Sequence, residues 1–245
     1  MIKSAFSSVD FKSIVNSFFL EISQAPLLHC IGDSHVAVFR KVEKSHFWWH
    51  TRFKFCIVPG ATATGLPNPN STTQAYRIFR EYLKSISVKD SVLFCLGEVD
   101  CGFVIWWRAQ KYNESVDSQT ELAIQRYINF IKEVQHMGFE KIILCSAPLP
   151  TILDNQDWGE IANKRREVTA PLLERTQLTL KFNNAIKLFA MANGLKYLDL
   201  DAVTYDKITG LVNDKFRNKN PLDHHLDPDN LSREIIPMLN ALGYW

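Results

Sequence analysis

The sequence predicts an α/β fold in a single domain, built as a three-layer α/β/α sandwich around a five-stranded parallel sheet. Five short apolar segments have strand character, and four of them are apolar almost throughout, as is typical of strands buried on both faces. Helical patterns lie between them, and strands that alternate with helices form parallel sheets. A chain of 245 residues suffices for one large domain but is short for two.

The predicted elements follow one another regularly along the chain. Strands are expected at residues 27–31, 53–58, 91–96, 141–146 and 195–200. The spacing of apolar residues predicts helices over residues 72–87, 121–137, 172–193 and 231–242. An amphipathic pattern over residues 11–19 predicts that residues 1–26 are a helical extension of the domain, which spans 1–245. Residues 99–118 and 202–228 are expected to be long irregular loops, which are often functional.

Composition excludes several classes of protein. The net charge of +2 gives no argument for a nucleic-acid or membrane partner. Charged residues interrupt the apolar stretches near the N-terminus, so we expect no signal peptide, no membrane span and a cytoplasmic location. The five cysteines have no zinc-site spacing, and we expect them to be free, buried thiols in a reducing compartment.

The segment Gly32-Asp33-Ser34-His35 follows the first predicted strand and opens a predicted helix. In an open parallel sheet, sites form beyond the carboxyl ends of the strands. A serine at this place gains the polarity of the helix N-terminus, and its amide is available to an oxyanion. Alternatively, Asp33 or Ser34 merely caps the helix. The segment by itself does not decide between these two interpretations.

Two further segments follow the second and third predicted strands. In residues 59–66, the amide of Gly60 or of Gly65 is a candidate second donor to an oxyanion, unless the segment is an ordinary Pro-Gly turn. In residues 97–100, Gly97 precedes two carboxylates, Glu98 and Asp100, which are unusual at the end of a buried strand. A helix cap or a salt-bridged pair is the alternative explanation for these carboxylates.

Late in the chain, Asp223, His224 and His225 lie just before the last predicted helix. A histidine base needs an acceptor on its other ring nitrogen to fix its tautomer, and Asp223 is close enough in sequence to His225 to provide it. Two adjacent histidines also suit a metal site or a solvated loop.

Taken together and in chain order, these segments resemble the SGNH (GDSL-like) hydrolase superfamily over residues 27–228. That family has a GDS block, a glycine block, a GxND block and a late DxxH block. The resemblance implies a flavodoxin-like sheet, with Ser34 as nucleophile, His225 as base and Asp223 as the residue that orients it. It further implies that residues near the oxyanion and substrate include Gly60, Gly65, Gly97, Glu98 and Asp100, and it leaves His224 as an alternative base.

The sequence departs from the family pattern in two blocks. The third block normally offers an Asn side chain to the oxyanion, and residues 97–100 contain no Asn. Either backbone amides alone bind the oxyanion, or a protonated Glu98 donates the missing hydrogen bond. In the last block, a DxxH reading that ends at His225 would place Leu222 in the acidic position, so the step from Asp223 to His225 is a shorter DxH variant.

The resemblance implies a serine esterase that acts on O-acyl groups, such as acetyl, of a carbohydrate or small ester, without a metal or cofactor. Aromatic residues at 47–50 and 106–107 are candidates for a stacking wall against that substrate, although packing in the core is the favoured interpretation. The alternatives are an O-acyltransferase, a non-catalytic SGNH-like module that binds a glycan or a protein, and a flavin or nucleotide binder. A further alternative is a metal hydrolase that uses Asp223, His224, His225 and Asp227.

Overall fold

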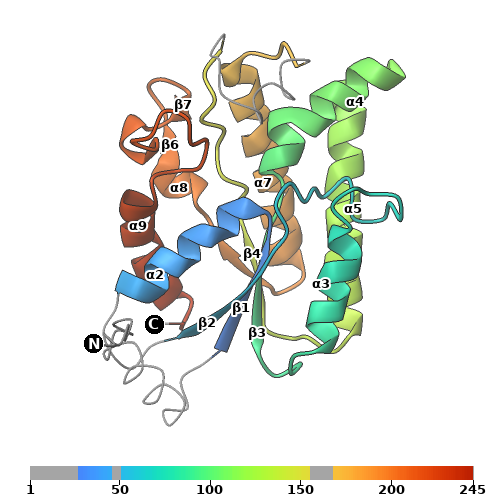
Figure 1. Ribbon diagram of the computed structural model, residues 1–245, viewed down its shortest axis with the longest axis vertical. Helices are drawn as coiled ribbons and strands as arrows, with labels where there is room; N and C mark the ends of the chain where they lie inside the picture. Colours follow the sequence, from blue (N-terminus) through green and yellow to red (C-terminus); the bar gives the residue numbers. More distant parts are fainter. Residues whose placement is uncertain (1–26, 46–50, 155–167, 245) are drawn as a thin grey trace, which may run out of the picture.

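The sheet has five strands, and all of them are parallel. The computed structural model describes residues 27–45, 51–154 and 168–244 (Figure 1). The strands are β1 (Leu27–Gly32), β2 (Arg52–Ile57), β3 (Ser91–Cys95), β4 (Ile142–Cys145) and β5 (Lys196–Leu198). Their order in the sheet is β2-β1-β3-β4-β5. The five predicted strands are confirmed, and this order is that of the flavodoxin-like doubly wound fold.

Helices cover both faces of the sheet and complete three layers (Figure 1). One face is covered by α3 (Ala75–Lys84), α5 (Val116–His136) and α7 (Leu172–Ala192). The other face is covered by η1 (Ser34–Val38), α2 (Phe39–Ser45) and α9 (Pro228–Ala241). Successive strand residues point to opposite faces, so Ile31 and Phe94 pack under the first group and Cys30 and Cys95 under the second. The four predicted helices that lie in the described residues are confirmed.

The prediction of an irregular loop over residues 99–118 is wrong. These residues form η2 (Asp100–Val104), α4 (Ile105–Tyr112) and the first turn of α5. Cys101, Ile105 and Ala109 are spaced four apart and all buried, which gives the segment an apolar helical stripe that packs on the core. Trp106 also packs against this core, and its indole Nε1–H donates to the Cys101 carbonyl oxygen at 2.7 Å.

The second predicted loop, residues 202–228, is largely irregular, as expected. It holds only short elements: α8 (Asp201–Thr204), β6 (Tyr205–Asp206), β7 (Leu211–Val212) and η3 (Asp214–Phe216). The segment brings Asp223 and the two histidines back to the sheet before α9 begins. The expected helix within residues 1–26 and the aromatic residues 47–50 lie outside the described residues.

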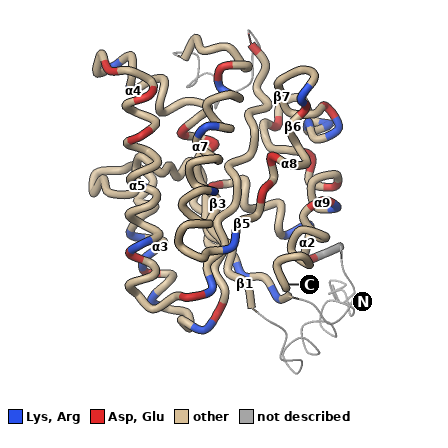
Figure 2. Tube along the Cα trace, turned by 180° about the vertical axis from the view of Figure 1, so that it is seen from behind, with Lys and Arg blue, Asp and Glu red and all other residues tan. Residues whose placement is uncertain are grey.

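The cysteines are free and buried, as the sequence predicts, and charged residues of both signs are mixed along the chain. All five cysteines are buried and none forms a disulfide. Lys and Arg are interspersed with Asp and Glu along the chain, so the small net charge reflects a mixed distribution (Figure 2). Among the described residues, none of the helices is both long enough and apolar enough to cross a membrane.

Candidate active site

The site begins at Gly32, the last residue of β1. Because glycine has no side chain, the backbone of β3 can approach this position closely. A Cβ atom on Gly32 would lie 2.1 Å from the carbonyl oxygen of Cys95 and 2.6 Å from Cγ2 of Val36. The chain then turns directly into η1. Asp33 caps η1 by accepting a hydrogen bond from the His35 amide at 2.9 Å. Asp33 is therefore the cap, and Ser34 is left as the first residue of the helix, where amides have no partner within the helix.

The structure brings Ser34, His225 and Asp223 together although 191 residues separate the serine from the histidine. The Ser34 hydroxyl Oγ lies 2.8 Å from Nε2 of His225. On the other side of the ring, Nδ1 of His225 lies 2.6 Å from Oδ1 of Asp223, which also accepts from the His225 amide at 3.0 Å. These contacts have the geometry of a nucleophile, a base and the group that orients the base.

Asp223 is held as an ionised acceptor. Burial alone would raise its pKa, but hydrogen bonds from the amide and the ring of His225 outweigh burial, and the pKa of Asp223 stays below its ordinary value. Its second oxygen, Oδ2, accepts a hydrogen bond from the side-chain amide of Asn218 at 3.0 Å. The ionised carboxylate fixes the His225 tautomer that carries hydrogen on Nδ1, which leaves the Nε2 lone pair facing Ser34.

The loop that carries the histidines is braced at several points. Arg217 pairs with Leu226 in an isolated antiparallel bridge, and its guanidinium donates to the Thr151 carbonyl oxygen at 2.7 Å. The Thr151 hydroxyl in turn donates to the carbonyl oxygen of His224. Asp227 caps α9 by accepting from two amides of its first turn. Asp227 therefore has a structural role at the helix start, which argues against its predicted part in a metal hydrolase.

Asp100 is held by backbone amides of the loop that follows β2. It is fully buried, and its two carboxylate oxygens accept hydrogen bonds from the amides of Ala63 at 2.7 Å and Thr64 at 2.9 Å. Burial raises the pKa of Asp100 to about 6, although hydrogen bonds from Thr64 and Ala63 oppose that rise. Asp100 therefore anchors the loop that follows β2, and its place near the substrate stays a prediction.

The two glycines of that loop lie in different hydrogen-bonded turns. The Gly65 amide is engaged within its own loop, where it donates to Oγ1 of Thr62 at 2.9 Å and to the Thr62 carbonyl oxygen at 3.2 Å. Gly60 lies in an exposed turn that is closed by a hydrogen bond from the Ala61 amide to the Val58 carbonyl oxygen at 3.0 Å. This turn is a Pro-Gly turn, and the role of either glycine amide toward an oxyanion stays a prediction.

Gly97 and Glu98 have different roles at the end of β3. Gly97 has a φ of +126°, a backbone conformation that favours glycine. A Cβ atom there would also lie 2.5 Å from the ring of Phe182, so both the backbone and the lack of space require glycine. Glu98 is only 2% exposed, and its Oε2 lies 3.9 Å from Nε2 of His35. Glu98 is thus a buried carboxyl group near the nucleophile turn, and its role toward the oxyanion stays a prediction.

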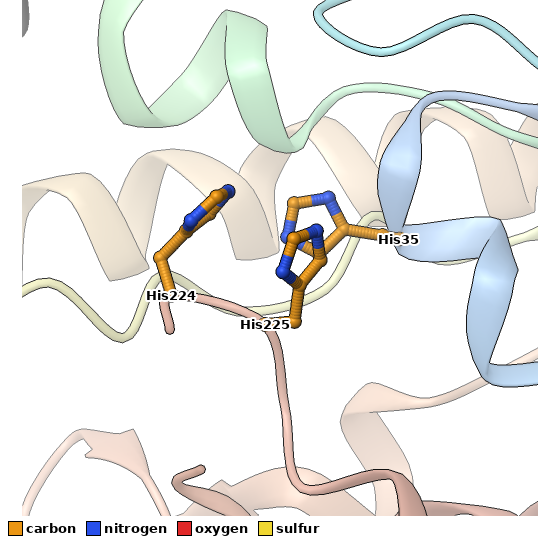
Figure 3. Close-up of side chains that lie close together, drawn as sticks. All are labelled: His35, His224 and His225. Carbon is orange, nitrogen blue, oxygen red and sulfur yellow. The ribbon is translucent and has the colours of Figure 1, made fainter. Parts of the chain in front are cut away.

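Sequence reasoning missed His35. Its buried ring lies 4.6 Å from the ring of His225 and 5.5 Å from that of His224, measured between centroids (Figure 3). Its Nδ1 lies 3.1 Å from Oδ1 of Asp33. His224, the alternative base, packs against His225, whereas the contact to Ser34 is made by His225. The position of His35 directly after Ser34 was the signal in the sequence that could have identified it.

Asn218 was also missed, and it supports a prediction. Asn218→Ala is expected to lower turnover of an ester substrate about tenfold, because Asp223 then loses a hydrogen bond that stabilises its charged form. Steady-state kinetics should show the loss in kcat with an unchanged melting temperature. A variant with unchanged kcat would show that the contacts of His225 alone orient Asp223.

Comparisons with known proteins bear on the fold. No protein-family model and no curated protein sequence matches this chain. Among solved structures, the chain is similar to a GDSL-like lipase from Bacteroides thetaiotaomicron, with 12% identity, 96% of this chain and 97% of that chain covered, and a TM-score of 0.55. It is also similar to a carbohydrate acetylesterase family member from Sinorhizobium meliloti, with 14% identity, 89% and 97% covered, and a TM-score of 0.52. The chain therefore has the fold of the GDSL-like (SGNH) hydrolases.

Proposed function

We propose that this chain is a serine acyl hydrolase of the SGNH (GDSL-like) superfamily, and that it removes O-acyl groups, foremost acetyl, from a carbohydrate or another small ester. The contact between Ser34 Oγ and His225 Nε2 at 2.8 Å, with Asp223 on the far side of the ring, carries the proposal. This contact lies beside the carboxyl ends of β1 and β3, where the strand order reverses and where sites of doubly wound sheets form. The fold shared with GDSL-like hydrolases supports the same conclusion.

The reaction proceeds in two halves. In the first, Nε2 of His225 accepts the Ser34 proton while Oγ attacks the ester carbonyl carbon, and Asp223 stabilises the imidazolium that forms. The tetrahedral intermediate then expels the alcohol, which takes the proton from His225 and leaves an acyl-serine. In the second half, His225 activates a water molecule that releases the acid and restores Ser34.

The oxyanion requires a donor that the family pattern would supply from an Asn, and Val99 occupies that position here. The amide of Ser34 supplies one donor. We propose Glu98 as the second. A carboxyl group removed from water favours its neutral form, and a neutral carboxyl group is a hydrogen-bond donor. This arrangement explains how a chain without the Asn retains a polar group beside the nucleophile turn.

Substitution of Glu98 tests this role. Glu98→Gln keeps a donor of similar size and is expected to retain turnover within about threefold, whereas Glu98→Ala is expected to lose about 10²-fold in kcat. The measurement is steady-state hydrolysis of a chromogenic acetyl ester, with circular dichroism to confirm folding. If a folded Glu98→Ala variant turned over as fast as the parent, backbone amides alone would bind the oxyanion.

The experiment that tests the overall proposal measures acetate release from O-acetylated sugars and from small acetyl esters, with Ser34→Ala as the matched control. Release by the parent chain alone supports the esterase. Acetyl transfer to an added sugar hydroxyl in place of release would support the acyltransferase. Failure to release or transfer acetyl, together with glycan binding, would support the non-catalytic module instead.

A further inference from the structure

Three histidine rings meet beside Ser34, and they come from two distant parts of the chain. His35 lies in η1, and His224 and His225 lie in the loop before α9 (Figure 3). One ring nitrogen from each residue lies within 4.8 Å of the others. The proposed hydrolysis uses only one of these rings, so the presence of the other two requires a separate explanation.

The arrangement is close to that of a three-histidine zinc site. With a zinc–nitrogen distance of 2.0–2.1 Å and tetrahedral geometry, the ligand nitrogens lie about 3.3 Å apart and the ring centroids about 5 Å apart. The centroid distances here are 4.2 Å, 4.6 Å and 5.5 Å. The ring centroids are therefore within about 0.8 Å of the required separation, and the nitrogens need to close by about 1.5 Å at most. His224 and His225 are only partly buried, which leaves room for this adjustment.

Two of the rings also have the outer partners that zinc-binding histidines usually have. Metal-binding histidines commonly donate their second ring N–H to a carboxylate, which fixes the tautomer and raises the basicity of the ligand nitrogen. Nδ1 of His35 lies 3.1 Å from Oδ1 of Asp33, and Nδ1 of His225 lies 2.6 Å from Oδ1 of Asp223. In both rings Nδ1 therefore faces the carboxylate, so Nε2 is the nitrogen that a metal ion would use; Nε2 of His225 contacts Ser34 Oγ at 2.8 Å, and Nε2 of His35 lies 3.9 Å from Oε2 of Glu98. The two carboxylates add negative charge that favours a cation.

We infer that His35, His224 and His225 bind a divalent cation that prefers imidazole ligands, such as Zn²⁺, and that the bound cation switches off the catalytic base. The second part rests on the proposed function. The Nε2 lone pair of His225 accepts the Ser34 hydroxyl proton in the resting site, at an oxygen–nitrogen distance of 2.8 Å. A metal ion bound to the same lone pair displaces that hydrogen bond. Ser34 then loses its base, and hydrolysis stops until the ion is removed.

The first experiment measures binding without reference to activity. The full chain, freed of metal with a chelator and then dialysed, is titrated with Zn²⁺ in competition with a chromophoric zinc indicator. We expect about one zinc ion per chain at this site, as a three-histidine set provides. His35→Asn and His224→Asn are each expected to weaken binding more than tenfold, as the loss of a ligand should exceed the effect of losing an outer partner. His136→Asn removes an exposed histidine on α5 and is the matched control.

The second experiment measures labelling of Ser34 by a fluorophosphonate probe with and without Zn²⁺. We expect zinc to block labelling, a chelator to restore it, and His224→Asn to need more than tenfold more zinc for the same block. Zinc binding unaffected by His35→Asn and His224→Asn would overturn the site. Zinc binding at the site that leaves labelling unchanged or accelerates it would overturn the switch. Failure of the proposed function is distinguishable, because the metal-free chain would then not be labelled at all.

Discussion

Ser34→Ala and His225→Ala are each expected to lower kcat for an ester substrate by about 10⁴–10⁶-fold, because each removes a group that forms or breaks a bond in the reaction. The two losses should not add in the double variant, since the serine and its base act as one unit. Asp223→Asn is expected to lose about 10³–10⁴-fold, because the imidazole then loses its charged partner and its fixed tautomer.

Labelling with a fluorophosphonate probe checks this prediction independently of the substrate. The parent chain should be labelled at Ser34, as located by peptide mass spectrometry, and Ser34→Ala should not be labelled. His225→Ala should be labelled far more slowly than the parent, and the control His136→Ala at the parental rate. A folded, metal-free parent chain that resists the probe would contradict the catalytic proposal and favour a binding module.

Gly32→Ala is expected to have the largest effect on stability, a loss of about 3–5 kcal/mol in the free energy of unfolding. The added Cβ would lie 2.1 Å from the carbonyl oxygen of Cys95, which is backbone in the neighbouring strand β3 and cannot rotate away. Relief requires β1 and β3 to separate, which breaks the centre of the sheet, where the register pairs Gly32 with Cys95. Chemical denaturation monitored by circular dichroism measures the loss.

Gly194→Ala is the matched control for this substitution. Gly194 follows α7 with a φ of +65°, and a Cβ atom there would meet no other atom within 4 Å. Its replacement should therefore cost only the backbone strain of a left-handed alanine, about 1–2 kcal/mol. Equal losses for the two variants would show that the sheet relaxes around position 32, and would contradict the steric argument for Gly32.

The sequence alone determined the order along the chain of the five strands of the main sheet and of the helices α3, α5, α7 and α9, but not the helix α4. Strands buried on both faces, such as β3 and β4, appear as continuous apolar runs, and the covering helices appear as apolar residues at helical spacing. Both signals are local, so they survive without knowledge of distant contacts. The same local logic located Ser34 just after a strand and His225 just before a helix, which made them candidates before their distance was known.

Tertiary structure decided which polar groups find partners. The fold directs the amides of Ala63 and Thr64 onto the carboxylate of Asp100 from 37 and 36 residues away, a pairing that the sequence did not predict. His35 follows Ser34 directly in sequence, but only the fold shows that its ring lies against the ring of His225. Such pairings depend on how strands and loops distant in sequence are brought to one edge of the sheet. A buried polar group takes the partner that the fold places within reach, and residue spacing along the chain does not encode that choice.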